Sequence, residues 1–250
     1  MSFTIALAGK GGTGKTTVAG MLIKYLTSKK MVPVLAVDAD PNANLNEVLG
    51  LDVAETLGKA REDMKKGVPR GMTRDVFMSM KIEQIILEAS GYDLIVMGQP
   101  EGKGCYCAAN SILTVVLERL TGSYPYVVMD NEAGMEHISR LTTKNVDILL
   151  IVTDTSRRGI QAAVRINKLA QELNIGVVKS FVLVNQVKGT LPDEALNIFK
   201  NAEIKFAGII PEDETVYQYD LKGIPTIEMP DENNAVKAAF NIFNKIIKTD

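Results

Sequence analysis

The chain begins with a pattern that binds phosphate groups in many proteins. The run Gly9-Lys10-Gly11-Gly12-Thr13-Gly14-Lys15-Thr16 matches G-x-x-x-x-G-K-[ST], and it lies between a strand-like apolar stretch and a helical pattern. Glycines at these positions let backbone N–H groups close around phosphate oxygens, and the following helix points its positive end at them. Lys15 is therefore predicted to contact the β- and γ-phosphates, and Thr16 to bind Mg²⁺. The predicted phosphate-binding loop also includes Gly11, Gly12, Thr13, Gly14 and Thr17.

Two later apolar stretches end in carboxylates that suit a magnesium–nucleotide site. Asp38 and Asp40 follow the second apolar stretch, and Asp130 ends the stretch that begins at Tyr126. Ligands of open α/β sheets bind beyond the carboxyl ends of the strands, so these carboxylates are predicted to reach the phosphate side. Asp130 is expected to hold Mg²⁺ through water. Gly134 is suited to offer its backbone N–H to the γ-phosphate, because a side chain would obstruct close approach.

Lys10 makes the loop pattern more specific. Lys-Gly-Gly-x-Gly-Lys-Thr resembles the deviant phosphate loop of the family that includes MinD and ParA partition ATPases, nitrogenase iron protein, arsenite-pump ATPase and several metal-insertion ATPases. The resemblance covers essentially the whole chain and implies a P-loop NTPase of the deviant Walker A class, hydrolysing ATP as a homodimer. It implies that Lys10 reaches across the two-fold interface to the partner's nucleotide. A second cation there would neutralise charge in the transition state, as an arginine finger does.

The same resemblance assigns roles to the carboxylates. It implies that Asp40 orients and activates the attacking water, while Asp38 lies near Mg²⁺ and the loop lysine. Asn42 and Asn44 belong to this first switch, and the segment from Asn131 to Glu136 resembles the second switch. Ordering of such loops by the γ-phosphate is a known way to couple hydrolysis to shape.

Base recognition is also predicted by resemblance. Asn185 matches the adenine-reading asparagine of the family, and Pro211 and Asp213 match its second base-side loop. Guanine-specific P-loop proteins usually show Asn-Lys-x-Asp, whereas this chain has Asn185-Gln186-Val187-Lys188. ATP is therefore favoured over GTP.

The two cysteines, Cys105 and Cys107, lie close together in a glycine-rich segment before an apolar helical run. A disulfide between such near neighbours would be strained, and the positive end of the helix favours the thiolate, which is the metal-binding form. One pair supplies only two ligands, while tetrahedral and soft-metal sites usually take four. Two copies facing each other across a two-fold axis would supply four sulfurs. The sequence thus predicts a thiolate site for zinc or another soft metal ion, shared across the dimer and controlled by the nucleotide.

The surroundings of the cysteines narrow the resemblance. The runs Gln99-Pro100-Glu101-Gly102-x-Gly-Cys-Tyr-Cys and Asn131–His137 resemble the ATPases, of the CooC/AcsF type, that mature carbon monoxide dehydrogenase or acetyl-CoA synthase by nickel insertion. This resemblance implies a metallochaperone with a nickel metalloenzyme as client, and the choice of nickel over zinc or copper rests on it alone. Two alternatives stay open. One is a MinD/ParA-like positioning or regulatory switch, and the other is an iron–sulfur cluster or electron-transfer ATPase.

The elements that must position these residues alternate along the chain. Near-continuous apolar runs predict strands at residues 2–8, 33–37, 93–97, 126–129, 147–152, 180–184 and 206–210. Helical patterns cover 15–28, 109–120 and 158–173. This alternation predicts a single doubly wound α/β domain over residues 1–250, with a mainly parallel central sheet. The segment 51–90 shows no clear pattern, and its charge clusters and methionines are expected to belong to ordinary helix packing.

Composition excludes several classes of protein. Hydrophobic residues make up 46% of the 250 residues and charged residues 23%, which is ordinary for a soluble globular protein. The net charge of −2 argues against binding nucleic acid through overall charge. No signal peptide and no run long enough to span a bilayer is evident, so we expect a cytoplasmic protein.

Two further features, the segment 235–248 and His137, each allow two interpretations. The amphipathic segment 235–248 is expected to pack on the parent domain rather than on a membrane, because it carries only three lysines. The single histidine, His137, is expected to be a hydrogen-bonded switch residue rather than a metal ligand.

Overall fold

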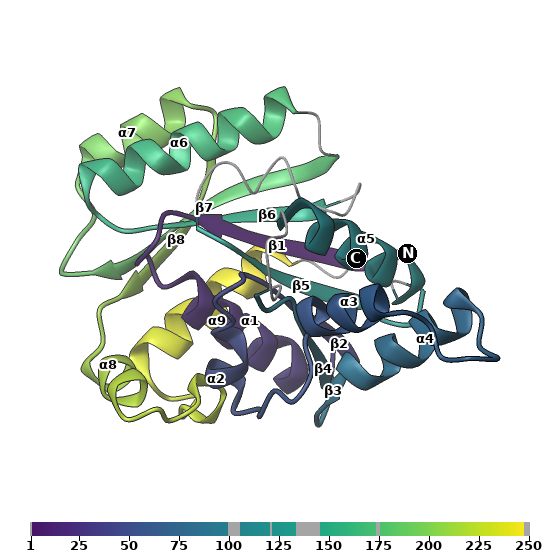
Figure 1. The fold of residues 1–250 in the computed structure, drawn as a ribbon. Helices are drawn as coiled ribbons and strands as arrows, with labels where there is room; N and C mark the ends of the chain where they lie inside the picture. The colour runs from purple at the N-terminus through teal and green to yellow at the C-terminus, as the bar shows by residue number, and fades with distance from the viewer. Residues whose placement is uncertain (1, 100–105, 121, 134–145, 174–175, 248–250) are drawn as a thin grey trace.

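The central element of the fold is a twisted, mainly parallel β-sheet (Figure 1). The computed structural model describes residues 2–99, 106–120, 122–133, 146–173 and 176–247. Its strands are β1 (Phe3–Gly9), β2 (Val34–Ala39), β3 (Leu87–Glu88), β4 (Tyr92–Val96), β5 (Tyr126–Asn131), β6 (Val146–Thr153), β7 (Val177–Val187) and β8 (Lys205–Pro211). Within the described residues they form one sheet in the order β3-β4-β2-β5-β1-β6-β7-β8, and only the β3–β4 pair is antiparallel.

Helices cover both faces of this sheet. They are α1 (Lys15–Ser28), α2 (Leu45–Leu49), α3 (Leu57–Lys66), α4 (Arg74–Ile85), α5 (Tyr106–Leu120), α6 (Arg157–Glu172), α7 (Asp193–Asn201), α8 (Glu214–Leu221) and α9 (Asn234–Ile246), with a short 3₁₀ turn at Thr226–Glu228. Successive residues of β1 show why both faces are apolar. Ile5 and Leu7 pack in one core with α1 and α9, while Ala6 and Ala8 pack in a second core with α5 and α6.

The predicted fold class is confirmed, and the predicted strands and helices all occur, α1 with the predicted ends and the others with ends shifted at one or both sides. β7 begins three residues earlier than expected, at Val177, and α5 begins at Tyr106 instead of residue 109. The segment 51–90, whose sequence shows no clear pattern, folds into α3, α4 and the antiparallel strand β3. Thr73 caps α4 by accepting a hydrogen bond from the Val76 N–H at 3.3 Å, a start signal that the sequence does contain.

The C-terminal helix α9 buries its apolar face against the body of the molecule. Val236, Ala239 and Phe243 are fully buried. The ring of Tyr25 on α1 packs edge-on against Phe240 and Phe243, with centroid distances of 5.3 and 5.7 Å. The expectation that this stripe packs on the parent domain is therefore confirmed. Among the described helices, none has the length and apolar composition needed to cross a membrane.

The contact between α1 and α9 yields a stability prediction. Replacing Phe243 by Ala removes a fully buried ring, and such changes cost about 3–5 kcal/mol because a cavity remains. Leu221 is 65% exposed, so Leu221→Ala is the control and should change stability little. Urea unfolding followed by circular dichroism measures both. Equal midpoints for the two variants would show that α9 is not part of the cooperative fold.

Candidate active site

The register of the central strands brings the predicted phosphate-side residues to one edge of the sheet. Asp130 of β5 is paired with Asp38 of β2 on one side and with Leu7 of β1 on the other. The phosphate loop leaves β1 at Gly9, which is paired with Val152 of β6. The carboxyl ends of β2, β5, β1 and β6 therefore lie in a row, with the loop between β1 and α1 in the middle.

Hydrogen bonds hold the phosphate loop in shape. The Thr13 hydroxyl donates to the Lys10 carbonyl oxygen at 2.9 Å, and the Lys15 ammonium reaches the same oxygen at 3.4 Å. Asn185, on β7, donates from its amide nitrogen to the Thr13 carbonyl oxygen at 3.0 Å. Gly14 has a left-handed φ of 77°, and a Cβ there would lie 2.5 Å from the Asn185 amide nitrogen. Gly14 is thus required both by its backbone conformation and by this close approach.

The charged groups of the site are buried, which shifts their pKa values. Burial lowers the pKa of Lys15, although Asp130 and Asp40 act in the opposite direction. Burial raises the pKa of Asp130 to about 7 against a hydrogen bond from Thr16, and nearby Asp38 raises it further. Burial likewise raises the pKa of Asp38 to about 6, opposed by backbone hydrogen bonds. A cation placed here would favour the ionised carboxylates.

The chemistry around Asp130 fits Mg²⁺. Asp130 is 2% exposed, and its Oδ1 atom is buried without a hydrogen-bond partner in the described part of the chain. The Thr16 hydroxyl, in the first turn of α1, hydrogen-bonds to the same carboxylate. A carboxylate and a hydroxyl beside a phosphate loop are the oxygen ligands that Mg²⁺ uses, directly or through water. Thr16 and Asp130 would hold the ion, and the ion would neutralise phosphate charge.

The first switch is built around two aspartates. Asp38 accepts hydrogen bonds from the backbone N–H groups of Leu45 at 2.9 Å and Asp40 at 3.1 Å. Asp40 accepts from the backbone and side-chain nitrogens of Asn42 at 2.9 and 3.0 Å. Asn44 precedes α2 but makes no side-chain capping bond. Asp38 therefore anchors the loop that carries Asp40, a structural role that the sequence did not reveal.

Lys10 is exposed at the tip of the phosphate loop, and its side chain has no ion pair among the residues that the structure describes. Its backbone carbonyl is held by Thr13 and Lys15, while its side chain stays exposed to solvent. This placement leaves the cation available to a second chain.

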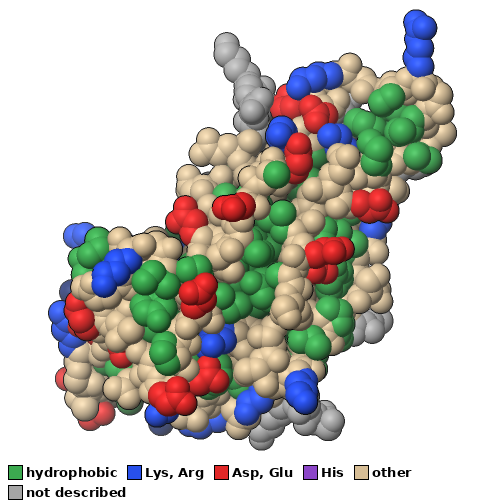
Figure 2. Space-filling view, turned by 90° about the horizontal axis from the view of Figure 1, so that it is seen from below, with side chains coloured by type: hydrophobic (Ala, Val, Ile, Leu, Met, Phe, Trp, Pro, Cys, Tyr) green, Lys and Arg blue, Asp and Glu red, His purple; other side chains and the backbone are tan. Residues whose placement is uncertain are grey.

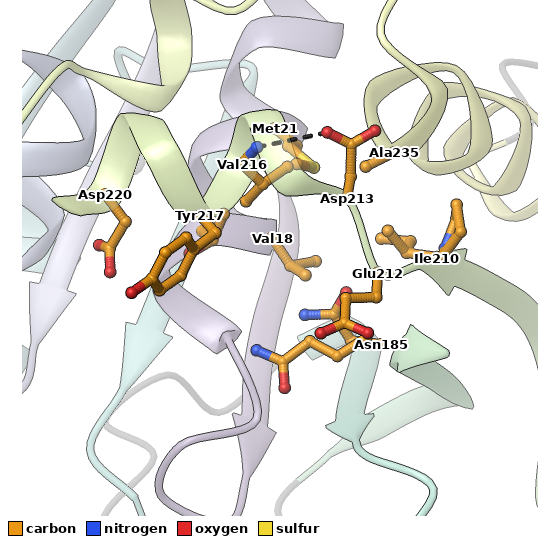
Figure 3. A pocket seen from close by; sticks show the side chains of 13 residues that line it. Val18, Met21, Asn185, Ile210, Glu212, Asp213, Val216, Tyr217, Asp220 and Ala235 are labelled. Atoms are coloured by element: carbon orange, nitrogen blue, oxygen red, sulfur yellow. Dashed lines mark hydrogen bonds between the residues drawn. The ribbon is translucent and has the colours of Figure 1, made fainter. Parts of the chain in front are cut away.

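A pocket of about 260 Å³ lies beside the phosphate loop and contains the three predicted base-side residues, Asn185, Pro211 and Asp213 (Figure 3). Asp213 also caps α8, since its Oδ1 accepts from the Thr215 N–H at 2.9 Å, and it accepts from the Asn233 side chain at 2.9 Å. Burial opposes the effect, but these hydrogen bonds lower the pKa of Asp213. The remaining lining residues include Val18, Met21, Val216, Tyr217 and Asp220.

Sequence reasoning missed the contribution of α8 to this pocket. Figure 3 shows Tyr217 and Asp220 projecting from α8 on the side opposite Asn185. An N-cap signal was present in the sequence, because Asp213 precedes the helix and is followed by Glu214 in its first turn. The helix has no buried residues, so it lacks the apolar periodicity on which helix prediction depends.

Several predicted residues fall outside the described part of the chain. These are Gly134, His137 and Cys105. Cys107 is the second residue of α5, but its side chain is not among those described. Within the described residues, no group of three or more His, Cys, Asp or Glu side chains is placed to hold a metal ion. The thiolate site therefore stays a prediction.

The raised pKa of Asp130 predicts how the stability of the folded protein depends on pH. Its ordinary value is 3.8, so between about pH 4 and pH 7 the folded chain binds this proton more tightly than the unfolded chain. This contribution to stability is fully present below about pH 4, falls progressively above it and is lost once the pH has risen through 7. Without ligand, Asp130→Asn should therefore melt several degrees above wild type at pH 8, and the difference should shrink steadily as the pH is lowered to 4, since each kcal/mol shifts the Tm by about 2–4 °C.

Added magnesium and ATP should reverse this order at pH 8, because only the wild-type carboxylate would hold the ion. Differential scanning calorimetry with and without the ligands measures both effects. An Asp130→Asn variant that is less stable than wild type at pH 8 without ligand would contradict the buried, uncompensated carboxylate.

Comparison with known proteins agrees with this geometry. Residues 4–227 match the family model described as the CobQ/CobB/MinD/ParA nucleotide binding domain. An uncharacterized ATP-binding protein of Methanocaldococcus jannaschii is 44% identical, covering 97% of this chain and 98% of its own length. The carbon monoxide dehydrogenase accessory protein CooC of Rhodospirillum rubrum is 30% identical, covering 94% and 95%.

Among solved structures, the septum site-determining protein MinD of Pyrococcus horikoshii, complexed with Mg-ADP, superimposes with a TM-score of 0.72. It is 21% identical, and the match covers 99% of this chain and 97% of that one, so it shows a shared fold. The match of the family model to most of the chain goes further than fold, because it includes the phosphate loop and both carboxylate-bearing strands. The chain belongs to the CobQ/CobB/MinD/ParA nucleotide-binding family and is an ATPase.

Proposed function

We propose that the protein is an ATP-hydrolysing metallochaperone that dimerises with nucleotide and metal and assists nickel insertion into carbon monoxide dehydrogenase or acetyl-CoA synthase. The observation that carries this proposal is the end-to-end similarity to a carbon monoxide dehydrogenase accessory protein, in a chain that also has the Cys105-Tyr106-Cys107 pair. Nickel is the cargo in this proposal, while ATP and Mg²⁺ serve the hydrolysis.

The position of α5 supports a link between the cysteines and the nucleotide. Cys107 lies in the first turn of α5, where the helix dipole favours a thiolate. The chain that leads there from β4 is tied to the first switch, because the Met97 N–H donates to the Asp38 carbonyl oxygen at 2.9 Å. The side chain of the same Asp38 anchors the switch loop at Leu45. A shift of that loop on ATP binding would therefore reach the segment that carries the cysteines.

The mechanism follows from the phosphate-side residues. Lys15 and the N–H groups of the loop bind the β- and γ-phosphates, and Thr16 and Asp130 would hold Mg²⁺, which would supply further positive charge there. Asp40 orients the attacking water, and Lys10 from the partner subunit compensates the charge that develops in transfer of the γ-phosphoryl group. Loss of that group removes the attraction for the partner's lysine. The dimer then loosens, and the four thiolates release the metal.

A positioning or regulatory switch of the MinD/ParA kind is the alternative. The buried apolar face of α9 disfavours membrane attachment through that helix. Figure 2 shows one face on which acidic and basic side chains are interspersed around apolar ones, without a continuous basic area for nucleic acid. We therefore favour the metallochaperone proposal over the MinD/ParA-like switch.

Metal stoichiometry tests the proposal. Wild type, purified without oxygen, should bind one Ni²⁺ per dimer, whereas Cys105→Ser/Cys107→Ser should bind none, because the four sulfurs are its ligands. ATP binding should survive in the double variant and serves as the control for folding. The dimer mass is measured on the same samples. No nickel binding by wild type would overturn the metallochaperone proposal, and a brown protein with visible absorbance would indicate an iron–sulfur cluster instead.

The role of Lys10 is tested separately. Lys10→Ala should keep ATP binding, since Lys15 and the loop N–H groups remain, but it should lower kcat by about a thousandfold, as loss of a trans cation does in related chemistry. It should also abolish the ATP-dependent dimer, measured by sedimentation. Lys237→Ala, an exposed lysine on α9, is the matched control. A Lys10→Ala enzyme with normal turnover would refute the trans role.

A further inference from the structure

Two consecutive residues of β7, Asn185 and Gln186, line the pocket beside the phosphate loop. Successive side chains of a regular strand point to opposite faces of the sheet, so two neighbours do not normally face the same pocket. Here the strand is irregular, because from Val184 to Val187 it advances three residues while the paired strand β8 advances two. Such an extra residue is a β-bulge, which bends the strand and re-aims a side chain.

Gln186 has a backbone conformation that is unfavourable for its residue type. Its φ is 57°, in the left-handed region that few residues other than glycine, asparagine and aspartate enter. Such a conformation persists only where the surrounding structure imposes it, and residues of this kind cluster at functional sites. The strand continues beyond the bulge, since the Val187 carbonyl oxygen accepts a hydrogen bond from the Glu212 N–H at 3.1 Å. The strained residue is therefore held by pairing before and after it.

The bulge brings the side-chain amide of Gln186 next to the phosphate loop. A Cβ on Gly14 would lie 2.5 Å from the Asn185 Nδ2 atom and 3.6 Å from the Gln186 Nε2 atom, so both amides face this glycine. Asn185 is 7% exposed and donates to the Thr13 carbonyl oxygen. Gln186 is exposed, and its amide makes no hydrogen bond within the part of the chain that the structure describes. Gln186 thus offers a donor and an acceptor to a ligand in the pocket.

We infer that Gln186 is a specificity-determining residue that contacts the adenine base of ATP beside Asn185. Its Nε2 atom donates to the adenine N7 atom, and its Oε1 atom accepts from the N6 amino group. A side-chain amide matches this edge of adenine at both positions. Guanine has two acceptors there, O6 and N7, so the amide oxygen would stay unpaired. The inference rests on ATP binding and does not depend on nickel or on a client enzyme.

An analogue that lacks one acceptor of the base tests this contact. 7-Deaza-ATP has a C–H group in place of N7, so wild type should bind it about five- to tenfold more weakly than ATP. Gln186→Ala should bind ATP about as weakly as wild type binds the analogue, and it should no longer distinguish the two. The change should appear in KM and leave kcat near that of wild type, because the contact is to the base. Gln84→Ala, at an exposed glutamine on α4, is the matched control.

Gln186→Gly separates the base contact from a disturbance of the fold. Glycine adopts a positive φ without strain, so this variant should melt at or above the wild-type temperature without ligand, yet lose the preference for ATP over 7-deaza-ATP. Calorimetric titration measures the affinities, and differential scanning calorimetry measures the melting. The inference is overturned if wild type binds the two nucleotides equally, or if Gln186→Ala keeps the wild-type affinity for ATP or the wild-type preference. A failure of nickel binding would leave all these outcomes unchanged.

Discussion

The burial of Asp130 beside Lys15 and Thr16 is the constraint on which the rest of the site depends. A carboxylate with a pKa of about 7 and an unpaired oxygen is unfavourable in a ligand-free protein. The surrounding sheet supplies the free energy that keeps it there, because β5 lies between β2 and β1 with apolar residues on both faces. The buried carboxylate therefore destabilises the ligand-free protein, and we expect the binding of magnesium and phosphate to remove this unfavourable free energy.

The strand order brings Asp130 together with the other residues of the site. β2, β5 and β1 end side by side, so Asp38, Asp130 and the phosphate loop share one edge although long stretches of chain separate them. Asp38 then extends the connection outward, with its side chain holding the switch loop and its carbonyl holding Met97. The elements that carry these residues, β1, β2, β4 and β5, all end at this edge of the sheet.

Much of this arrangement was predictable from the sequence, and the reasons are physical. Strands buried on both faces, such as β1, β5 and β6, are nearly continuous apolar runs, and the phosphate loop has a spacing that few other structures require. α8 was missed because it buries no residues, and β3 because it is two residues long. The anchoring role of Asp38 and the bond between Asn185 and Thr13 depend on tertiary contacts that no local pattern encodes. The predicted thiolate site was not tested, because Cys105 and the side chain of Cys107 are outside the described part of the chain.

The bond between Asn185 and Thr13 has a consequence for how such a site can change. The amide predicted to read the base already supports the loop that holds the phosphates, across 172 residues of sequence. A substitution of Asn185 would remove this hydrogen bond to the phosphate loop, at a point where the Asn185 amide and the Gly14 backbone already approach so closely that a Cβ on Gly14 would lie 2.5 Å from the amide nitrogen. A change at this one position would therefore alter the support of the phosphate loop together with the predicted base contact.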